Sequence, residues 1–306
     1  MTRPNFFIVG APKCGTTAMD HYLKQHPDIY MAKKELHYFG SDLPMKNRIK
    51  ESEYLEHFKH SNDKKIIGES SVWYLYSRMA AKEIHEFAPD AKILIMLRNP
   101  VTLLPSLHSE RIYNGNDDVS DFETAINLDE DRKKGLRQPV CADYNMLPPY
   151  KETGLFYEQV KRYTNLFGRA NVHIIIFEEL IKNPTLYTKQ VFKFLELNED
   201  VPLICDKINA GKKIRNLWLH RIIKTPGLVV KKIIRLLIPS KSLRHRIMST
   251  LLKKNTNIES KRNLNEQLND RLYAYYQNDI NLLETLIGRN LYGWYSPTRN
   301  IYASND

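Results

Sequence analysis

The stretch that most constrains the fold lies at the start of the chain. Residues 5–10 read NFFIVG, a short apolar run rich in residues with high β propensity. The loop that follows contains Ala11, Pro12, Lys13, Cys14, Gly15, Thr16 and Thr17. A helical pattern then begins, because Met19, Tyr22 and Leu23 share one face. A strand, a glycine-bounded turn and a helix in this order aim backbone N–H groups and a helix N-terminus at a bound anion.

The loop is close to a nucleotide-binding P-loop but differs in one respect. Gly10 and Gly15 have the separation of the pattern G-x-x-x-x-G-K-[ST], but Thr16 occupies the position of its lysine. The only lysine of the loop is Lys13, which would reach a ligand from the rim. The alternative is a glycine–proline turn that enters an ordinary helix. Five suitable elements in the right order favour the anion-binding loop.

Apolar runs recur along the first two thirds of the chain. Strands are predicted at residues 5–10, 29–31, 65–69, 91–97 and 171–177. Helices are predicted at residues 52–59, 76–87, 101–113 and 145–167. Residues 91–97, AKILIML, are typical of a parallel strand buried on both faces. This alternation predicts an α/β fold that is P-loop-like, with three layers and a central parallel sheet.

The character of the chain changes after Gly211. Residues 215–252 lack a strand signal and mix Lys and Arg with Leu, Ile and Val, whereas residues 264–287 have the pattern of a polar helix. We expect a single domain over residues 1–306, with an α/β core at 1–213 and a helical C-terminal extension at 214–306.

The chain is basic, with 46 Lys and Arg residues against 35 Asp and Glu, a formal net charge of +11. Such a charge is either a solvated surface or a field that attracts polyanions and anionic cofactors. Nucleic acid is not expected as a partner, because no helix-turn-helix, RRM signature or zinc spacing is present. The three cysteines, Cys14, Cys141 and Cys205, suggest neither a disulfide framework nor a metal site.

The sequence contains no apolar stretch near the ~20 residues of a membrane-spanning helix. Residues 2–4 lead directly into the first predicted strand, and they do not have the pattern of a signal peptide. The prediction is a cytoplasmic protein or an excised domain, with an oligomeric state that the sequence leaves open.

A second candidate for anion binding follows the strand at 91–97. In a P-loop kinase an acidic residue near this point helps to hold Mg²⁺. This strand ends instead in Arg98, at the edge of the sheet that faces a ligand crevice. Ser106 lies eight residues further on, in the next predicted helix. The alternative is an arginine that caps the sheet edge and a solvated serine.

These motifs together resemble the PAPS-dependent sulfotransferases. PAPS is 3′-phosphoadenosine 5′-phosphosulfate, the sulfuryl donor. The segment FFIVGAPKCGTTAMDHYLKQHPDIYMAKKELHYF is similar to their N-terminal segment, and its KKELHYF part is most similar to the heparan sulfate and bacterial sulfotransferases. The resemblance covers most of residues 5–210 and returns at 285–294. It implies that residues 12–17 bind the 5′-phosphosulfate, and that Arg98 and Ser106 bind the 3′-phosphate.

The resemblance also implies an acceptor site. Glu35 matches a glutamate proposed as the general base, and His37 lies beside it. Glu69 and Ser70 would line the acceptor cleft, with Glu69 as a second candidate base or as a partner that orients a lysine. This chain departs from the family at Gly40, where an acidic residue is frequent, and at Ser70 and Val72, where lysine and proline are frequent. The alternatives are a solvated charge at Glu35 and a packing role for His37.

Two later segments carry looser predictions. Asn209, Lys212 and Lys213 resemble the family's later cofactor loop, but the two lysines could equally be surface charges. Residues 217–254 predict either two helices packed with basic outer faces, or a surface for a membrane or an acidic acceptor. Pro226 and Pro239 cut this segment into short pieces and favour the packing interpretation.

The predicted function is transfer of the sulfuryl group of PAPS to a hydroxyl of a polysaccharide, oligosaccharide or glycolipid, without a metal. The acceptor would attack sulfur in line, Glu35 would take its proton, and Lys13 would stabilise charge on the leaving oxygen. One alternative is a small-molecule kinase or NTPase that needs ATP and Mg²⁺. The other is a non-catalytic basic module that binds polyanions or anionic membranes.

Overall fold

The computed structural model describes residues 2–61, 63–139, 144–206, 212–216, 220, 223–224, 234, 236–238, 240–258 and 265–295. Contacts divide the chain into two units. The first unit contains Met1–Leu104, Lys151–Asn209 and Asn265–Asp306, and the second contains Pro105–Tyr150 and Ala210–Leu264. These units do not follow the expected boundary at residue 213, and the single-domain organisation stays a prediction.

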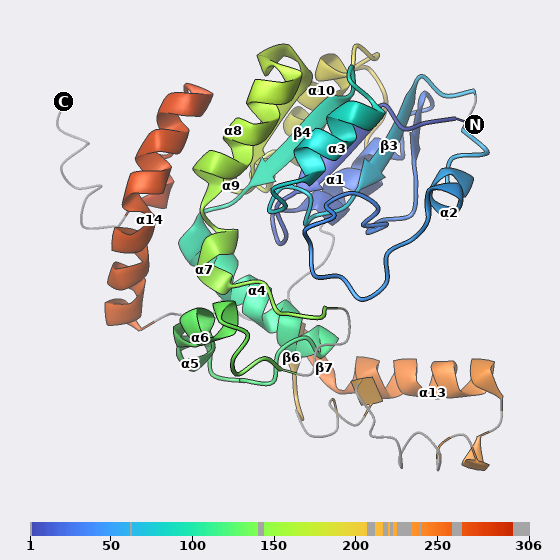
Figure 1. The fold of residues 1–306 in the computed structure, drawn as a ribbon. Helices are drawn as coiled ribbons and strands as arrows, with labels where there is room; N and C mark the ends of the chain where they lie inside the picture. The colour runs from blue at the N-terminus through green and yellow to red at the C-terminus, as the bar shows by residue number, and fades with distance from the viewer. Residues whose placement is uncertain are drawn as a thin grey trace. The chain divides into compact units, whose positions relative to one another are not determined.

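The first unit is built on a sheet of five parallel strands. They are β1 (Phe6–Gly10), β2 (Ile29–Met31), β3 (Ile66–Ser70), β4 (Lys92–Leu97) and β5 (Val172–Ile176). The order across the sheet is β2-β3-β1-β4-β5, and every neighbouring pair is parallel (Figure 1). All five predicted strands are confirmed. Because the chain leaves β1 toward one side of the sheet and later returns to the other, the carboxyl end of β1 lies at a topological switch point.

Helices cover both faces of this sheet. Those of the first unit are α1 (Thr16–Leu23), α2 (Glu51–Glu56), α3 (Ala80–Phe87), α8 (Phe156–Phe167), α9 (Phe177–Leu180), α10 (Pro184–Phe194) and α14 (Glu266–Ile287). α3 and α8 lie on one face of the sheet, α1 and α10 pack together near the other, and α14 packs on α8 (Figure 1). The prediction of a three-layer α/β fold with a helical C-terminal part is confirmed.

The burial of the two central strands, β1 and β4, explains why their sequences are uninterrupted apolar runs. Phe6, Phe7, Ile8 and Val9 in β1 are completely buried, and so are the five residues at 93–97 in β4. A strand covered by helices on both faces has no solvated side, so polar residues do not alternate with apolar ones. Each of these large side chains stabilises the fold by about 1.5–3 kcal/mol.

The long helix predicted at residues 145–167 is wrong. The structure has two helices here, α7 (Tyr150–Thr153) and α8, separated at 154–155. Pro148 and Pro149 cannot lie inside a helix without losing hydrogen bonds. The start of α8 is set by a distant residue, because the N–H groups of Phe156 and Tyr157 donate to the carboxylate of Asp279 in α14, at 2.7 and 3.2 Å.

This carboxylate should make stability depend on pH. Burial raises the pKa of Asp279 from its ordinary value of 3.8 to about 6, although the two N–H donors oppose the rise. The folded protein therefore binds the proton more tightly than the unfolded chain, and the free energy of unfolding should fall as pH rises from about 4 to about 6. In Asp279→Asn this contribution should vanish. The difference in free energy of unfolding between the wild type and the variant should therefore change by about 1–3 kcal/mol across that window. Urea unfolding of both proteins at several pH values measures this change. If the free energies of unfolding of the two proteins depend on pH in the same way, the raised pKa of Asp279 is contradicted.

The second unit contains most of α4 (Pro100–Asn114), with α5 (Phe122–Asn127), α6 (Asp129–Lys133) and α13 (Lys241–Lys254). It also contains a two-stranded antiparallel ribbon of β6 (Lys212–Ile214) and β7 (Thr256–Ile258). Its interior holds a fully buried ion pair of 2.8 Å between Arg132 and Asp117, whose carboxylate also accepts the Tyr150 hydroxyl at 2.7 Å. Within the described part of the chain, no helix has the length and apolar character needed to cross a membrane.

Candidate functional site

The loop after β1 is held in a conformation that needs glycine at both ends. Gly10 has a φ of 137°, and a Cβ atom there would lie 2.3 Å from the carbonyl oxygen of Val72. Gly15 has a φ of 87°, caps the N-terminus of α1, and packs against the ring of Phe177 at 3.1 Å from where a Cβ would be. The loop backbone therefore starts α1 at the carboxyl end of β1, as predicted for an anion-binding loop.

The side chains of this loop divide into inward and outward sets. Pro12, Cys14 and Thr16 are buried, Lys13 is half-buried, and Thr17 is exposed. The Cys14 thiol donates to the carbonyl oxygen of Pro12 at 3.4 Å, and burial raises its pKa far above the ordinary value. Cys14 is therefore a neutral packing residue, and a ligand of the loop would meet its backbone and not its thiol.

Arg98 is tied directly to the loop. Its guanidinium donates to the carbonyl oxygen of Lys13 at 3.3 Å and to the hydroxyl of Thr102 at 3.1 Å, and it lies 4.8 Å from the centre of the Phe177 ring. Burial lowers the pKa of Arg98, but a guanidinium remains charged at neutral pH. The structure thus brings the two predicted cationic positions together. Ser106 is half-buried on α4 and belongs to the second unit.

Glu35 and His37 form a pair, as the family resemblance implied. The His37 Nε2 atom lies 3.2 Å from Oε2 of Glu35, which also accepts the N–H of Val72 at 3.1 Å. The Glu35 side chain is 36% exposed and that of His37 is 12% exposed. The carboxylate is therefore held in place at one oxygen and remains open to an approaching molecule.

Lys34 is a site residue that sequence reasoning missed. Its ammonium group donates to the hydroxyls of Ser70 at 2.9 Å and Thr16 at 3.2 Å, and lies 3.8 Å from Oε1 of Glu35. It therefore links the N-terminus of α1 to the candidate base. In the sequence Lys34 was indistinguishable from Lys33, because neither hydroxyl partner lies near it in the chain.

The backbone at these residues is also unusual. Among the described residues, only five other than glycine have a positive φ, and three of them are Lys13 at 65°, Glu35 at 62° and His37 at 49°. Such conformations are uncommon for residues with a Cβ, and they persist where the surrounding structure imposes them. Their concentration at three predicted catalytic positions supports a functional site here.

Glu69 lies at the centre of a buried hydrogen-bond network. Its carboxylate accepts the hydroxyls of Tyr54, Ser71 and Tyr74, each at 2.7 Å. Burial raises the pKa of Glu69, whereas the three donors oppose the rise. Tyr74 in turn accepts the N–H groups of Tyr38 and Phe39, and Ser71 accepts that of His37. The network thus anchors the loop that carries Glu35 and His37.

Several predicted positions are placed differently from the expectation. Glu69 and Ser70 were expected at the acceptor cleft, but both are completely buried, so they would act on an acceptor only through Lys34 and the 35–39 loop. Lys212 and Lys213 lie in strand β6 and not in a loop. Asn209 lies outside the described residues. The cofactor-binding role of these last three residues stays a prediction.

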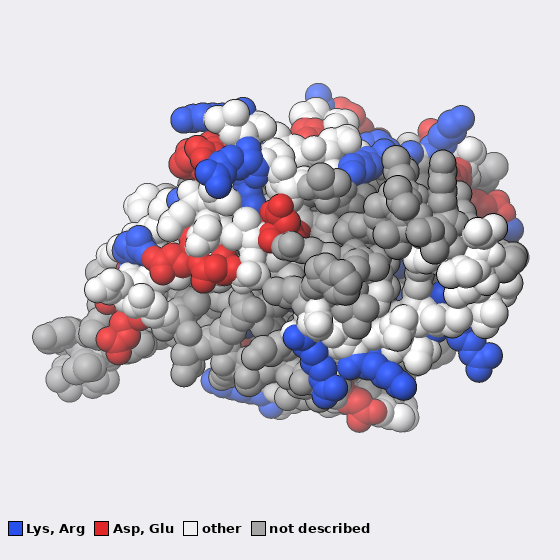
Figure 2. All heavy atoms as spheres, turned by 90° about the horizontal axis from the view of Figure 1, so that it is seen from below, with Lys and Arg blue, Asp and Glu red and all other residues white. Residues whose placement is uncertain are grey.

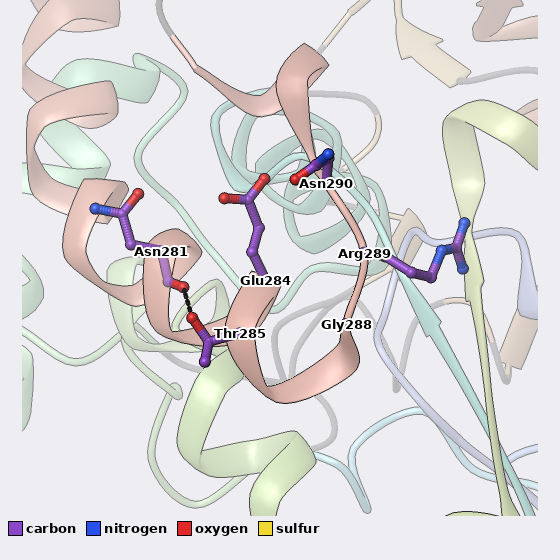
Figure 3. A pocket seen from close by; sticks show the side chains of 6 residues that line it. All are labelled: Asn281, Glu284, Thr285, Gly288, Arg289 and Asn290. Carbon is purple, nitrogen blue, oxygen red and sulfur yellow. Dashed lines mark hydrogen bonds between the residues drawn. The ribbon is translucent and has the colours of Figure 1, made fainter.

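A separate hollow lies at the C-terminal end of α14 (Figure 3). Its lining consists of Asn281, Glu284, Thr285, Gly288, Arg289 and Asn290. The residues around it have structural partners: Glu284 accepts the N–H of Leu291, and Arg289 forms an ion pair of 2.6 Å with Glu179. These contacts fasten the end of α14, and none of the predicted site residues lines this hollow.

Two curated proteins are similar in sequence to this chain over almost two thirds of its length. Carbohydrate sulfotransferase 15 of Mus musculus is 27% identical over 248 residues, which cover 63% of this chain and 44% of that protein. The membrane-associated sulfotransferase kil1 of Dictyostelium discoideum is 22% identical over 267 residues, which cover 64% of this chain and 56% of that protein. The chain thus spans about half the length of the curated relatives it matches.

A solved structure extends the similarity over nearly the whole chain. The crystal structure of a sulfotransferase from Alicyclobacillus acidocaldarius is 28% identical, with a TM-score of 0.71, and the match covers 96% of this chain and 99% of that one. The sequence profile of the sulfotransferase domain matches residues 3–226, which include the loop after β1, Glu35 and Arg98. The chain therefore belongs to the sulfotransferase domain family.

Proposed function

We propose that this chain transfers the sulfuryl group of PAPS to a hydroxyl group of a carbohydrate acceptor. The observation that carries the proposal is a continuous series of contacts across the site. Arg98 bonds to the backbone of Lys13, the loop leads to Thr16, Lys34 bonds to Thr16, and the same ammonium group lies beside Glu35. This series joins an anion-binding end to a carboxylate that is open to solvent.

The residues present fit such a donor. A 5′-phosphosulfate carries negative charge on both phosphate and sulfate, and it suits the N-terminus of α1 with Lys13, Lys34 and the Thr16 hydroxyl around it. A guanidinium binds phosphate with two parallel hydrogen bonds, which suits Arg98 for the second phosphate of the donor. The phosphate-binding role of Ser106 stays a prediction. Helix α1 has eight residues and begins at Thr16, directly after its N-cap residue Gly15.

The reaction would be an in-line displacement at sulfur. The acceptor oxygen forms a bond to sulfur while the bond from sulfur to the phosphate oxygen breaks, and the acceptor proton passes to Glu35. Negative charge then grows on the leaving phosphate oxygen, where Lys13 and the loop N–H groups stabilise it. Lys34 would stabilise the same charge from the side of Thr16. His37 and the Val72 N–H hold the carboxylate of Glu35 in position.

The carbohydrate acceptor has support from the family. A relative of this chain is named a carbohydrate sulfotransferase, and the half-exposed Glu35 side chain leaves room for a sugar hydroxyl. The polysaccharide, oligosaccharide or glycolipid that is modified, and the expected cytoplasmic location, stay predictions.

Calorimetric titration with the product 3′-phosphoadenosine 5′-phosphate, with and without Mg²⁺, tests the proposal. The wild type should bind without the metal, and Arg98→Ala should weaken binding by about 10- to 100-fold because a charge-assisted phosphate contact is lost. Arg78→Ala is the matched control, since this arginine is exposed and should leave the affinity unchanged.

Two other results would each replace the proposal. Binding of ATP with Mg²⁺ but not of the adenosine bisphosphate would indicate a kinase or NTPase. Weak binding that declines smoothly with salt and is equally sensitive to Arg98→Ala and Arg78→Ala would indicate a non-catalytic polyanion-binding module.

A further inference from the structure

The positive charge of this chain is concentrated in one segment. Residues 207–258 contain 14 Lys and Arg residues and no Asp or Glu. The rest of the chain has 32 basic and 35 acidic residues, a net charge of −3, so this segment accounts for the whole net charge of +11. On the face drawn in Figure 2, blue and red side chains are interspersed, so the net charge by itself does not identify a binding surface.

Most of this segment belongs to the second unit, and its two ends pair with each other. Strands β6 and β7 pair in antiparallel fashion, so that Lys212 lies opposite Ile258. The N–H of Arg215 donates to the carbonyl oxygen of Asn255 at 2.9 Å, and the side chain of Asn255 makes two further bonds of 2.9 Å to the backbone of Asn216. The segment between Asn216 and Asn255, which includes α13, is therefore an excursion of the chain that begins and ends at this ribbon.

Helix α13 within this excursion exposes a row of apolar side chains. Leu243, Ile247 and Leu251 are 49%, 37% and 40% exposed. Their spacing of four residues places them in a stripe along one face of the helix. At about 100° of rotation per residue, Arg244 and Arg246 lie on opposite flanks of this stripe.

Two further exposed leucines precede the helix in the chain. Leu236 and Leu237, which precede α13, are 81% and 73% exposed. Single exposed leucines are common on protein surfaces, but a stripe of them bordered by cations is the pattern of a helix that lies in a membrane interface.

We propose that α13, together with Leu236 and Leu237, docks on the surface of an anionic lipid bilayer. The helix would lie in the plane of the interface. Its apolar stripe would lie among the acyl chains, and its arginines would lie at the lipid phosphates. An acidic polysaccharide could pair with the arginines but would leave the apolar stripe exposed to water. The combination of cations and exposed leucines therefore favours a lipid surface.

Sedimentation with lipid vesicles tests this proposal on the full chain. Vesicles of phosphatidylcholine with about one third phosphatidylserine should bind the wild type, more weakly as salt increases, and vesicles of phosphatidylcholine alone should bind it much less. The triple variant Leu243→Asn, Ile247→Asn, Leu251→Asn should lose at least about 10-fold in vesicle affinity, because it removes inserted apolar area without changing the charge.

A second triple variant is the matched control. Leu166→Asn, Leu186→Asn and Leu282→Asn change similarly exposed apolar residues in the first unit. This variant should bind the vesicles within about twofold of the wild type. Circular dichroism and thermal melting of both triple variants separate a lost surface from a lost fold.

Three outcomes would overturn the proposal. The first is a wild-type protein that does not bind the anionic vesicles. The second is a folded α13 variant that binds them as tightly as the control. The third is strong binding to heparin that the α13 variant retains, combined with little vesicle binding by the wild type, which would identify a polyanion as the occupant of this surface.

Discussion

Replacing Lys13 with alanine is expected to reduce the rate of sulfuryl transfer from PAPS by about 10²–10³-fold. Lys13 lies in the loop at the start of α1, in a positive-φ conformation, and its carbonyl oxygen is held by Arg98. Its ammonium group is expected to stabilise charge that grows on the leaving oxygen in the transition state. Because that charge is smaller in the bound donor, the turnover rate should fall more than the affinity for 3′-phosphoadenosine 5′-phosphate.

The measurement is the initial rate of adenosine bisphosphate release with the best carbohydrate acceptor from a panel, alongside calorimetry of the product. Lys33→Ala is the matched control, because Lys33 is an exposed lysine that precedes Lys34 in the neighbouring loop. It should stay within about threefold of the wild type. Equal losses for Lys13→Ala and Lys33→Ala would mean that charge alone matters, which contradicts a specific role for Lys13.

Replacing Glu35 with glutamine is expected to reduce transfer by about 10²–10⁴-fold while leaving product affinity nearly unchanged. Glutamine has the same shape and keeps an acceptor for the Val72 N–H, so the local geometry should survive. It cannot take a proton from the acceptor hydroxyl. The comparison of turnover with the binding of 3′-phosphoadenosine 5′-phosphate therefore separates loss of the base from loss of the donor site.

Glu53→Gln provides the control, because Glu53 is an exposed glutamate of α2 and should have no effect. The variant Lys34→Met refines the result. If Lys34 stabilises the leaving group, this variant should lower turnover in the wild-type background by about 10-fold or more. A Glu35→Gln enzyme that keeps more than a tenth of wild-type activity would exclude Glu35 as the base and direct attention to His37.

The strands were predictable because a strand that is buried on both faces has an uninterrupted apolar sequence. Residues 91–97 are apolar without interruption, and the structure shows the five at 93–97 completely buried. Gly15 of the first loop was equally readable, because its φ of 87° is a left-handed conformation that residues with a Cβ atom rarely adopt. Such local constraints depend only on neighbouring residues or on burial itself.

The predicted long helix at 145–167 shows the limit of this reasoning. Its apolar spacing suggested one helix, but the start of α8 is set by Asp279, which lies more than a hundred residues away. Pro148 and Pro149 are a local signal against one continuous helix. Hydrogen-bond partners of this kind cannot be identified from periodicity, because they belong to a different helix.

Taken by itself, the sequence determined the five-stranded α/β fold, the glycine-bounded loop after β1 and the residues Lys13, Glu35, His37 and Arg98 as candidates. Only the tertiary structure decided that Lys34 joins Thr16 to Glu35, and that Glu69 supports the loop that carries Glu35 and His37 from a buried position. The physical reason is that sequence patterns indicate which residues are buried and where the chain turns, but not which distant residues become neighbours. The pairings of β3 with β1 and with β2 bring Thr16 and Ser70 within hydrogen-bond distance of Lys34, and these pairings join segments about sixty and about forty residues apart.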